Sequence, residues 1–465
     1  MSSHASAAGP SWPARLALPV LLVLAVVASL LVTARAEAAS GDLAWQRAYN
    51  GTANDDDYWV GVAGAPKGGV YVAGSVRRDA GGMPVHYDFA VARYAAGGTR
   101  QWLRTFDGPA RYQDIAMDVA SDRYGNVVVV GYVNYLALAP QLAAVVKYNA
   151  QGQRRWARFY DAPNGSSEIA DKAATDAAGN VYVAGEYSTP GSGADVFLAK
   201  YSSSGARKWV RTYSGSGQDR IHDMAIDGRG NVYLTGFTYR DATDYDMLTL
   251  KYRPNGTRSW ARRLDGPASS TDMGNGIVVT WGGTVYVAGQ VVDITTGTDA
   301  AVVKYSTGGT FRWLSTRSSM GASNDHYLDI ALLGNGDLAV AGDIDAGPLT
   351  EDTDVLLARL SHAGGTRWAR TYDGPNALDD GGESVATVGG DIYVAGFTTS
   401  ATTARDILTL KYGGGGQPRW ARSHGGLDAS NDFVGGILAV SGGVYTAGKR
   451  GAANGNDGIL LKYRP

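Results

Sequence analysis

The stretch from Asp219 to Gly266, DRIHDMAIDGRGNVYLTGFTYRDATDYDMLTLKYRPNGTRSWARRLDG, decides the fold. It consists of four short runs with strand-like alternation, separated by turns and loops rich in Gly, Asn and Asp. The runs DRIHDMAID, NVYLTGF, DMLTLKY and SWARRLDG are predicted to be strands, which we call A, B, C and D in chain order. Nearly all of the chain after residue 40 is a variation on this unit, which predicts one closed β structure.

Four landmarks recur eight times, and successive Trp residues are 51 to 57 residues apart. A Trp leads strand D at Trp45, Trp102, Trp156, Trp209, Trp260, Trp313, Trp368 and Trp420. A Gly ends the YVAG-like core of strand B at Gly74, Gly131, Gly185, Gly236, Gly289, Gly342, Gly396 and Gly448. A basic residue near the end of strand C precedes Tyr in seven units and Leu360 in the sixth. An acid opens strand A at Asp57, Asp114, Glu168, Asp219, Asp272, Asp325 and Asp379, with Asp432 one residue late in the last unit.

This period, filled by four strands, is typical of propeller blades. The repeat begins on a D strand, at residues 43–51, and ends on a C strand, at residues 458–463. We therefore predict an all-β, eight-bladed β-propeller of four-stranded antiparallel blades, in which the N-terminal strand completes the last blade. An open solenoid is the alternative, but it would leave two unpaired edges that closure removes.

The repeated side chains are predicted to hold the blades together. The Trp of strand D is expected to pack between blades, because large aromatic side chains supply most of the cohesion in such a core. The Arg of strand D, the basic residue of strand C and two acidic columns are expected to form interblade ion pairs and bonds from turn N–H groups to carboxylates. Catalytic acids do not occur in sets of eight, which favours this structural interpretation.

Composition excludes several classes of protein. The chain has 42 Lys and Arg, 44 Asp and Glu, and a net charge of -2, so it lacks the basic field of a nucleic-acid binder. It has no Cys, which excludes disulfides, thiolate metal sites and Cys nucleophiles. We expect a monomer without a cofactor.

The N-terminus resembles a secretory signal peptide. Residues 16–32, LALPVLLVLAVVASLLV, are all uncharged and mostly apolar, and the sequence ARAEA follows at residues 34–38. We predict a signal peptide at residues 1–39 and a propeller at residues 40–465, secreted or on the cell surface. An uncleaved anchor is the alternative, since about 20 apolar residues span a bilayer; no other membrane contact is expected.

Function is expected on one face of the ring. The D–A and B–C loops share a face, which we call the loop face, while the short A–B and C–D turns share the opposite turn face. The B–C loops vary in length and content, and variable loops on a rigid scaffold usually carry recognition. A non-enzymatic binding or scaffolding module for a protein or glycan is therefore predicted. Its candidate ligand-binding residues are Trp59, Tyr112, Tyr135, Tyr239, Asp57, Asp114, Asp219, Asp272, Asp325 and Asp379.

Two alternatives stay open, a cation-binding propeller and a secreted propeller enzyme that is glycan-active or quinoprotein-like. Against a cation, the chain has no Asp-x-Asp-x-Asp-Gly loop, and a ring of spaced carboxylates is too wide for one Ca²⁺. The sequences Asp55-Asp56-Asp57 and Asp379-Asp380 are local candidates only. Against an enzyme, the six His show no metal spacing and no Ser-His-Asp order stands out, so no catalytic residue and no metal ligand is assigned.

The repeat resembles the SBBP-type bacterial β-propeller repeat. The resemblance is carried by Asp219, by the turn Asp227-Gly-Arg-Gly-Asn231 and by Val232-Tyr-Leu-Thr-Gly236, and it covers nearly all of residues 43–463. Units two, six and eight depart from it: Val128 and Ala339 replace the strand-B Tyr, and Ser441 to Gly443 replace the turn. The resemblance implies an exported bacterial propeller, often on the cell surface, without assigned activity or catalytic residues.

Overall fold

The computed structural model describes residues 39–465, except for 52, 54, 79–85, 111, 135–139, 163–165, 190–192, 242–243, 269, 320–322, 348–351, 402–403, 427–429 and 453–454. Two units are distinguished, Met1–Ala39 and Ser40–Pro465. The predicted signal segment lies, apart from Ala39, outside the described residues. In the described part, no helix has the length and apolar character needed to cross a bilayer.

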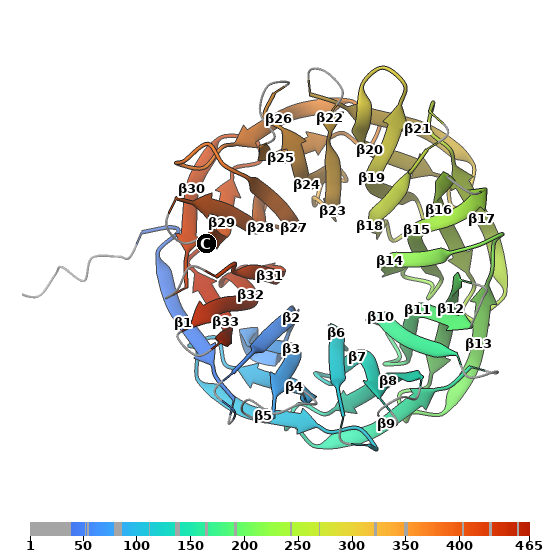
Figure 1. The fold of residues 1–465 in the computed structure, drawn as a ribbon, viewed down its shortest axis with the longest axis vertical. Coiled ribbons are helices and arrows are strands. Elements are labelled where there is room, and N and C mark those ends of the chain that lie inside the picture. Colours follow the sequence, from blue (N-terminus) through green and yellow to red (C-terminus); the bar gives the residue numbers. More distant parts are fainter. Residues whose placement is uncertain are drawn as a thin grey trace, which may run out of the picture. The chain divides into compact units, whose positions relative to one another are not determined.

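Residues Ser40–Pro465 form eight antiparallel sheets arranged as a ring (Figure 1). Each sheet contains strands in the order A-B-C-D, with A nearest the centre, and a two-residue strand joins the fifth sheet. We number the sheets as blades 1 to 8, beginning with the blade that contains residues 57–106. The predicted eight-bladed propeller is confirmed, and the stretch from Asp219 to Gly266 is blade 4.

The inner two strands of each blade follow the predicted landmarks. The A strands are β2 (Asp57–Gly64), β6 (Asp114–Ser121), β10 (Ser167–Thr175), β14 (Asp219–Ile226), β18 (Met273–Val279), β23 (His326–Leu332), β27 (Asp380–Val388) and β31 (Phe433–Val440). The B strands are β3 (Val70–Arg77), β7 (Val127–Asn134), β11 (Val181–Thr189), β15 (Val232–Asp241), β19 (Val285–Asp293), β24 (Leu338–Asp345), β28 (Asp391–Ser400) and β32 (Gly443–Ala452).

The outer two strands carry the basic and Trp landmarks. The C strands are β4 (Tyr87–Tyr94), β8 (Gln141–Tyr148), β12 (Gly193–Tyr201), β16 (Asp244–Tyr252), β20 (Gly297–Tyr305), β25 (Thr353–Leu360), β29 (Ala404–Tyr412) and β33 (Gly455–Tyr463). The D strands are β5 (Arg100–Phe106), β9 (Arg154–Tyr160), β13 (Arg207–Tyr213), β17 (Arg258–Leu264), β21 (Phe311–Arg317), β26 (Thr366–Tyr372), β30 (Pro418–His424) and β1 (Leu43–Tyr49). A 3-10 turn, η1 (Pro66–Gly68), lies between β2 and β3, and β22 (Ser323–Asn324) pairs with β20.

The ring closes in blade 8, where β1 pairs antiparallel with β33. The C–D turn of this blade is divided between the two ends of the propeller, because the Gly41 N–H donates to the Arg464 carbonyl and the Arg464 N–H donates to the Asp42 carbonyl, each at 3.0 Å. Gly41 has a φ of 85°, as the turn glycines of the other blades do. Gly41 is therefore the turn glycine of blade 8.

Every A strand has a β-bulge at the same place. The register against strand B shifts between residues 59/61, 116/118, 170/172, 221/223, 274/276, 327/329, 382/384 and 434/436. The YVAG-type glycine of strand B faces the bulge, and a Cβ atom on any of the eight glycines would lie 1.8–2.0 Å from a strand-A carbonyl oxygen. The bulge therefore explains why these positions are glycine.

The Trp of each D strand packs on the C–D turn of the next blade. Trp156 of blade 2 is 6% exposed, and its Nε1 donates to the Ser203 carbonyl of blade 3 at 3.0 Å. A Cβ on Gly205, in the same turn, would lie 2.7 Å from the indole. The same relation holds from Trp45 and Gly98 around the ring to Trp420 and Gly41. The predicted packing between blades is confirmed.

The basic columns bond mainly to backbone across the blade junctions. The Arg two residues after the Trp donates from Nε to the turn-glycine carbonyl of the next blade, as Arg158 does to Gly205 at 2.7 Å. Lys147 pairs with Asp122 of its own blade at 3.0 Å and donates to the Gly179 carbonyl of blade 3 at 2.9 Å. The expected pairing of these columns with the strand-A acids does not occur there, because the nearest acceptors across the junction are turn carbonyl oxygens.

Candidate functional site

The acids that open the A strands are buried and hold the D–A loops. Asp272, which is fully buried, accepts the Gly266 N–H at 2.5 Å and the Val292 N–H at 2.8 Å, and so joins the loop to strand B. The same pair of bonds, from the loop and from strand B, is made by Asp57 and Asp325. The predicted bonding of carboxylates to loop N–H groups is confirmed. These candidates do not present their carboxylates at the mouth of the channel.

Asp380, and not Asp379, occupies this column in blade 7. Asp380 is fully buried and accepts the Gly374 N–H, whereas Asp379 is half-buried and lies 3.7 Å from Arg405. The A–B turn of blade 7 contains only Gly389 and Gly390, so its acid stands one residue closer to strand B than in blades 1 to 6. The prediction of Asp379 was wrong because it assumed a constant turn length.

Burial changes the acid–base behaviour of this column. Burial raises the pKa of Asp114 to about 7 and those of Asp57 and Asp272 to about 6. By contrast, hydrogen bonds from Asn126 and Lys147 outweigh burial and hold the pKa of Asp122 below its usual value.

We expect the propeller to melt at a higher temperature at pH 5 than at pH 8. A carboxyl whose pKa is raised by folding binds its proton more tightly in the folded chain, so the free energy of unfolding falls as pH rises from about 4 to about 7. Carboxyls with a lowered pKa, such as Asp122, stabilise the fold above pH ~4 and lose this effect only below it. Calorimetry at constant ionic strength is the check, and a melting temperature that rises from pH 5 to 8 would contradict it.

The aromatic candidates of the loop face are only partly available. Trp59 lies inside β2, is 2% exposed and packs on Tyr49, so it is a core residue of the seam between blades 8 and 1. Its expected loop exposure was wrong, because the preceding loop ends at Asp57. Tyr112 and Tyr239 are half-buried, with Tyr112 against His86 and Tyr239 against Tyr245. Tyr135 lies outside the described residues.

The centre of the ring contains a polar cavity of about 280 Å³, lined by residues that include Lys172, His222, Asp223, Asp329 and Glu383. The carboxylates of Asp223 and Asp329 accept backbone N–H groups of the next A strand, from Ile277 and Val385, each at 2.8 Å. Asp118 does the same toward Ala173. These acids after the bulge therefore align neighbouring blades.

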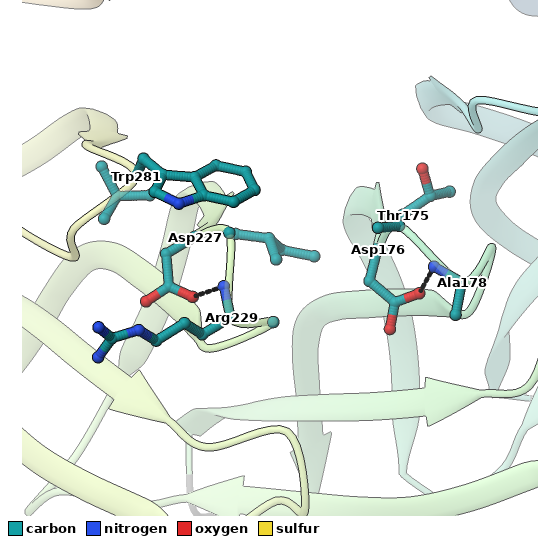
Figure 2. Close-up of a pocket in the computed structure, with 11 residues that line it drawn as sticks. Thr175, Asp176, Ala178, Asp227, Arg229 and Trp281 are labelled. Atoms are coloured by element: carbon teal, nitrogen blue, oxygen red, sulfur yellow. Dashed lines mark hydrogen bonds between the residues drawn. The ribbon is translucent and has the colours of Figure 1, made fainter.

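The turn face has a groove of about 410 Å³ over blades 3, 4 and 5 (Figure 2). Trp281, in the A–B turn of blade 5, is 81% exposed and forms one side of the groove. Its indole lies against the blade 4 turn, where a Cβ on Gly228 would be 2.4 Å away. The turn from Thr175 to Ala178 of blade 3 forms the opposite side, and the exposed Arg229 extends from the blade 4 turn with its guanidinium pointing away from the blade 3 turn (Figure 2).

The carboxylates in the groove accept hydrogen bonds from backbone N–H groups of their own turns. Asp227 accepts the N–H groups of Arg229 and Asn231 at 2.9 Å, and Asp176 accepts those of Ala178 and Asn180 at 2.9 Å. These bonds fix the shape of the turns and therefore of the groove. The exposed groups that remain for a ligand are the Trp281 ring and the Arg229 guanidinium.

Trp281 was not among the residues predicted from the sequence. The signal was present, because Trp281 is outside the eight-membered Trp column and stands at a turn position that is Arg123, Ala177, Gly228 and Gly334 in blades 2, 3, 4 and 6. A large aromatic side chain in such a turn has no core to enter. The turn face was not expected to carry a site because its turns are short and similar in length.

Comparison with known proteins gives no family. No protein-family model and no curated protein matches the chain. Similar solved structures include a puromycin hydrolase, at 14% identity and a TM-score of 0.48, covering 88% of this chain and 61% of that one. Another is the WD40 domain of SCAP from fission yeast, at 9% identity and a TM-score of 0.44, covering 90% and 94%. The β-propeller domain of the Trilobed protease from Pyrococcus furiosus has 9% identity and a TM-score of 0.43, covering 75% and 92%.

Proposed function

We propose that the protein is an exported, monomeric, non-enzymatic binding propeller of the SBBP type whose ligand is a glycan. The observation that carries the choice of ligand is the exposed indole of Trp281 beside a groove of about 410 Å³. Planar aromatic faces offer a large apolar contact at small entropic cost, and the C–H faces of sugar rings fit them. Arg229, exposed in the same groove, supplies donors for hydroxyl or carboxylate groups of the sugar.

A second exposed aromatic supports an extended ligand. Tyr124, in the A–B turn of blade 2, is 56% exposed and lies against the blade 3 turn, 3.4 Å from the position of a Cβ on Gly179. That turn is also the far wall of the Trp281 groove. A chain of several sugar units therefore has a stacking platform on either side of the blade 3 and blade 4 turns. The loop face has fewer exposed aromatic side chains among the described residues, so the turn face is the preferred surface.

We expect Trp281→Ala to weaken glycan binding at least tenfold while leaving the melting temperature nearly unchanged, since the ring is mostly in solvent. A glycan array followed by titration of the positive sugars measures the effect. Phe311→Ala is the matched control, because Phe311 is 49% exposed but lies in strand D outside the groove. Glycan binding that survives Trp281→Ala would overturn the site, and an array without hits beside a captured protein ligand would overturn the ligand class.

A further inference from the structure

The turns of the turn face carry a surplus of exposed positive charge. In the described A–B and C–D turns, every exposed side chain of Lys, Arg, Asp or Glu is basic. These side chains are Lys67, Arg123, Arg229, Arg253 and Arg464. The first two residues of the D strands, which adjoin the C–D turns, add further exposed Arg and Lys and no acid. The net charge of -2 for the whole chain therefore hides a basic face.

The acids of the A–B turns do not offset these bases, because they interact with the basic residue of strand C in their own blade. The pairs are Asp122 with Lys147, Asp176 with Lys200 and Asp337 with Arg359, at distances of 3.0, 3.7 and 2.7 Å. In blade 4, the charge of Asp227 acts on Lys251. The acids are also buried or half-buried, whereas the turn bases are exposed. The potential that a ligand meets at this face is therefore positive.

Each exposed aromatic side chain of the A–B turns has an Arg beside it. The Arg123 guanidinium lies 4.8 Å from the centre of the Tyr124 ring, and its Nη2 donates to the Tyr124 hydroxyl at 2.6 Å. Arg229 lines the same groove as Trp281 (Figure 2). Among the described residues, no acid forms an ion pair with either guanidinium. A flat surface for a sugar ring and an unpaired positive charge for an acidic group therefore occur together twice on this face.

We propose that the ligand of the turn face is an acidic polysaccharide whose sugar rings carry carboxylate groups, as uronic acids do. This inference rests on the glycan-binding function proposed above and names the class of glycan. Sugar rings stack on the Trp281 and Tyr124 side chains, over blades 2 to 5, and their carboxylates pair with the neighbouring guanidinium groups. A guanidinium group binds a carboxylate through two parallel N–H donors, an interaction that a neutral sugar cannot make.

The groove distinguishes an acidic sugar from a nucleic acid, the other polymer that basic and aromatic side chains bind together. Burial opposes ionisation of Asp176 and Asp227, which line the groove, but hydrogen bonds from their own turns hold both pKa values below the usual range. Both carboxylates therefore stay ionised at neutral pH and repel the closely spaced phosphates of a nucleic acid. A uronic acid has several hydroxyl groups on the ring that carries its carboxylate, and these hydroxyl groups can donate to Asp176 and Asp227.

Titration of the full chain with polygalacturonate and with alginate, each compared with its methyl ester, tests the proposal. The ester keeps the sugar rings and their hydroxyl groups but has no negative charge. We expect at least one acidic polymer to bind and its ester to bind at least tenfold more weakly, since the loss of one charge-assisted hydrogen bond costs about tenfold in affinity. Raising the NaCl concentration from about 0.05 M to about 0.5 M should weaken binding of the acidic form more than that of the ester.

Arg123→Ala and Arg229→Ala assign the effect to the turn face. Each should weaken binding of the acidic polymer by about threefold to tenfold. Each should leave the melting temperature nearly unchanged, because both side chains are exposed. Arg263→Ala is the matched control, because Arg263 is an exposed Arg of blade 4 that lies near the loop-face end of β17, 3.8 Å from Asp246. This control should bind the acidic polymer as the wild-type chain does.

The outcomes separate the acidic class from the glycan function on which it rests. Esters or neutral glycans that bind as tightly as the acidic polymers would overturn the acidic class and leave glycan binding intact. An equal loss in Arg263→Ala and Arg229→Ala, or tighter binding of single-stranded DNA than of either acidic polymer, would also overturn it. If neither acidic polymer binds, the acidic class is wrong, and if no neutral glycan binds either, the glycan function falls with it.

Discussion

Replacing Gly236 by alanine is expected to prevent the propeller from folding or to lower its free energy of unfolding by about 4 kcal/mol or more. The added Cβ would lie 2.0 Å from the carbonyl oxygen of Arg220, a backbone atom that belongs to the strand-A bulge. Relief requires the bulge to move, and the bulge also positions Asp223 for its bond to the Ile277 N–H of blade 5. The damage therefore extends from blade 4 to the next blade junction.

Denaturant unfolding followed by tryptophan fluorescence measures this effect. Gly97→Ala is the matched control, because no atom lies within 4 Å of the position that its Cβ would take and its φ is not in the left-handed region. We expect the control to change the stability by less than about 1 kcal/mol. If Gly236→Ala were as stable as Gly97→Ala, strand A of blade 4 would not have the bulge described here.

Trp156→Ala is expected to lower the free energy of unfolding by about 3–5 kcal/mol, the range found when a large aromatic side chain is removed from a core. The indole fills the junction between blades 2 and 3, stacks near Tyr201 at 6.0 Å between ring centres, and donates to the Ser203 carbonyl. Its removal leaves a cavity and an unpaired carbonyl at the same place. The turn glycine Gly205 has no side chain to fill that space.

Trp281→Ala provides the control for this prediction as well. Both substitutions remove an indole, but Trp281 is 81% exposed, so its loss should cost less than about 1 kcal/mol. Chemical denaturation of the two variants side by side distinguishes a core role from a surface role. A loss below about 1 kcal/mol for Trp156→Ala would place the Trp column outside the core.

Much of the fold was predictable because each blade repeats the same contacts. The Trp column and the strand-B glycines marked the strands, and the N-terminal D strand matched the missing strand of blade 8. The bulge was not predictable in this way, since a glycine in strand B has no single structural meaning. The acid of blade 7 was assigned one residue too early because a two-residue turn at Gly389 and Gly390 shortens the repeat.

The candidate sites were less predictable because they depend on side chains that differ from the repeat pattern. Trp59 was expected among the exposed aromatic residues of the loop face, whereas it is buried at the seam of the ring. In the sequence, Trp281 could be noticed only because it lies outside the Trp column of the D strands.

The division of blade 8 between β1 and β33 also sets an order of events during synthesis. The ribosome releases β1 first, and its pairing partner appears only after about 400 further residues. Until then, β1 is an edge strand with unpaired backbone groups, the kind of edge that invites pairing with other chains. Blades 1 to 7 each consist of one contiguous stretch of chain, whereas blade 8 can form only when β1 and β33 are both present. The propeller is therefore prone to aggregation until β1 pairs with β33 and the hydrogen bond between Gly41 and Arg464 forms.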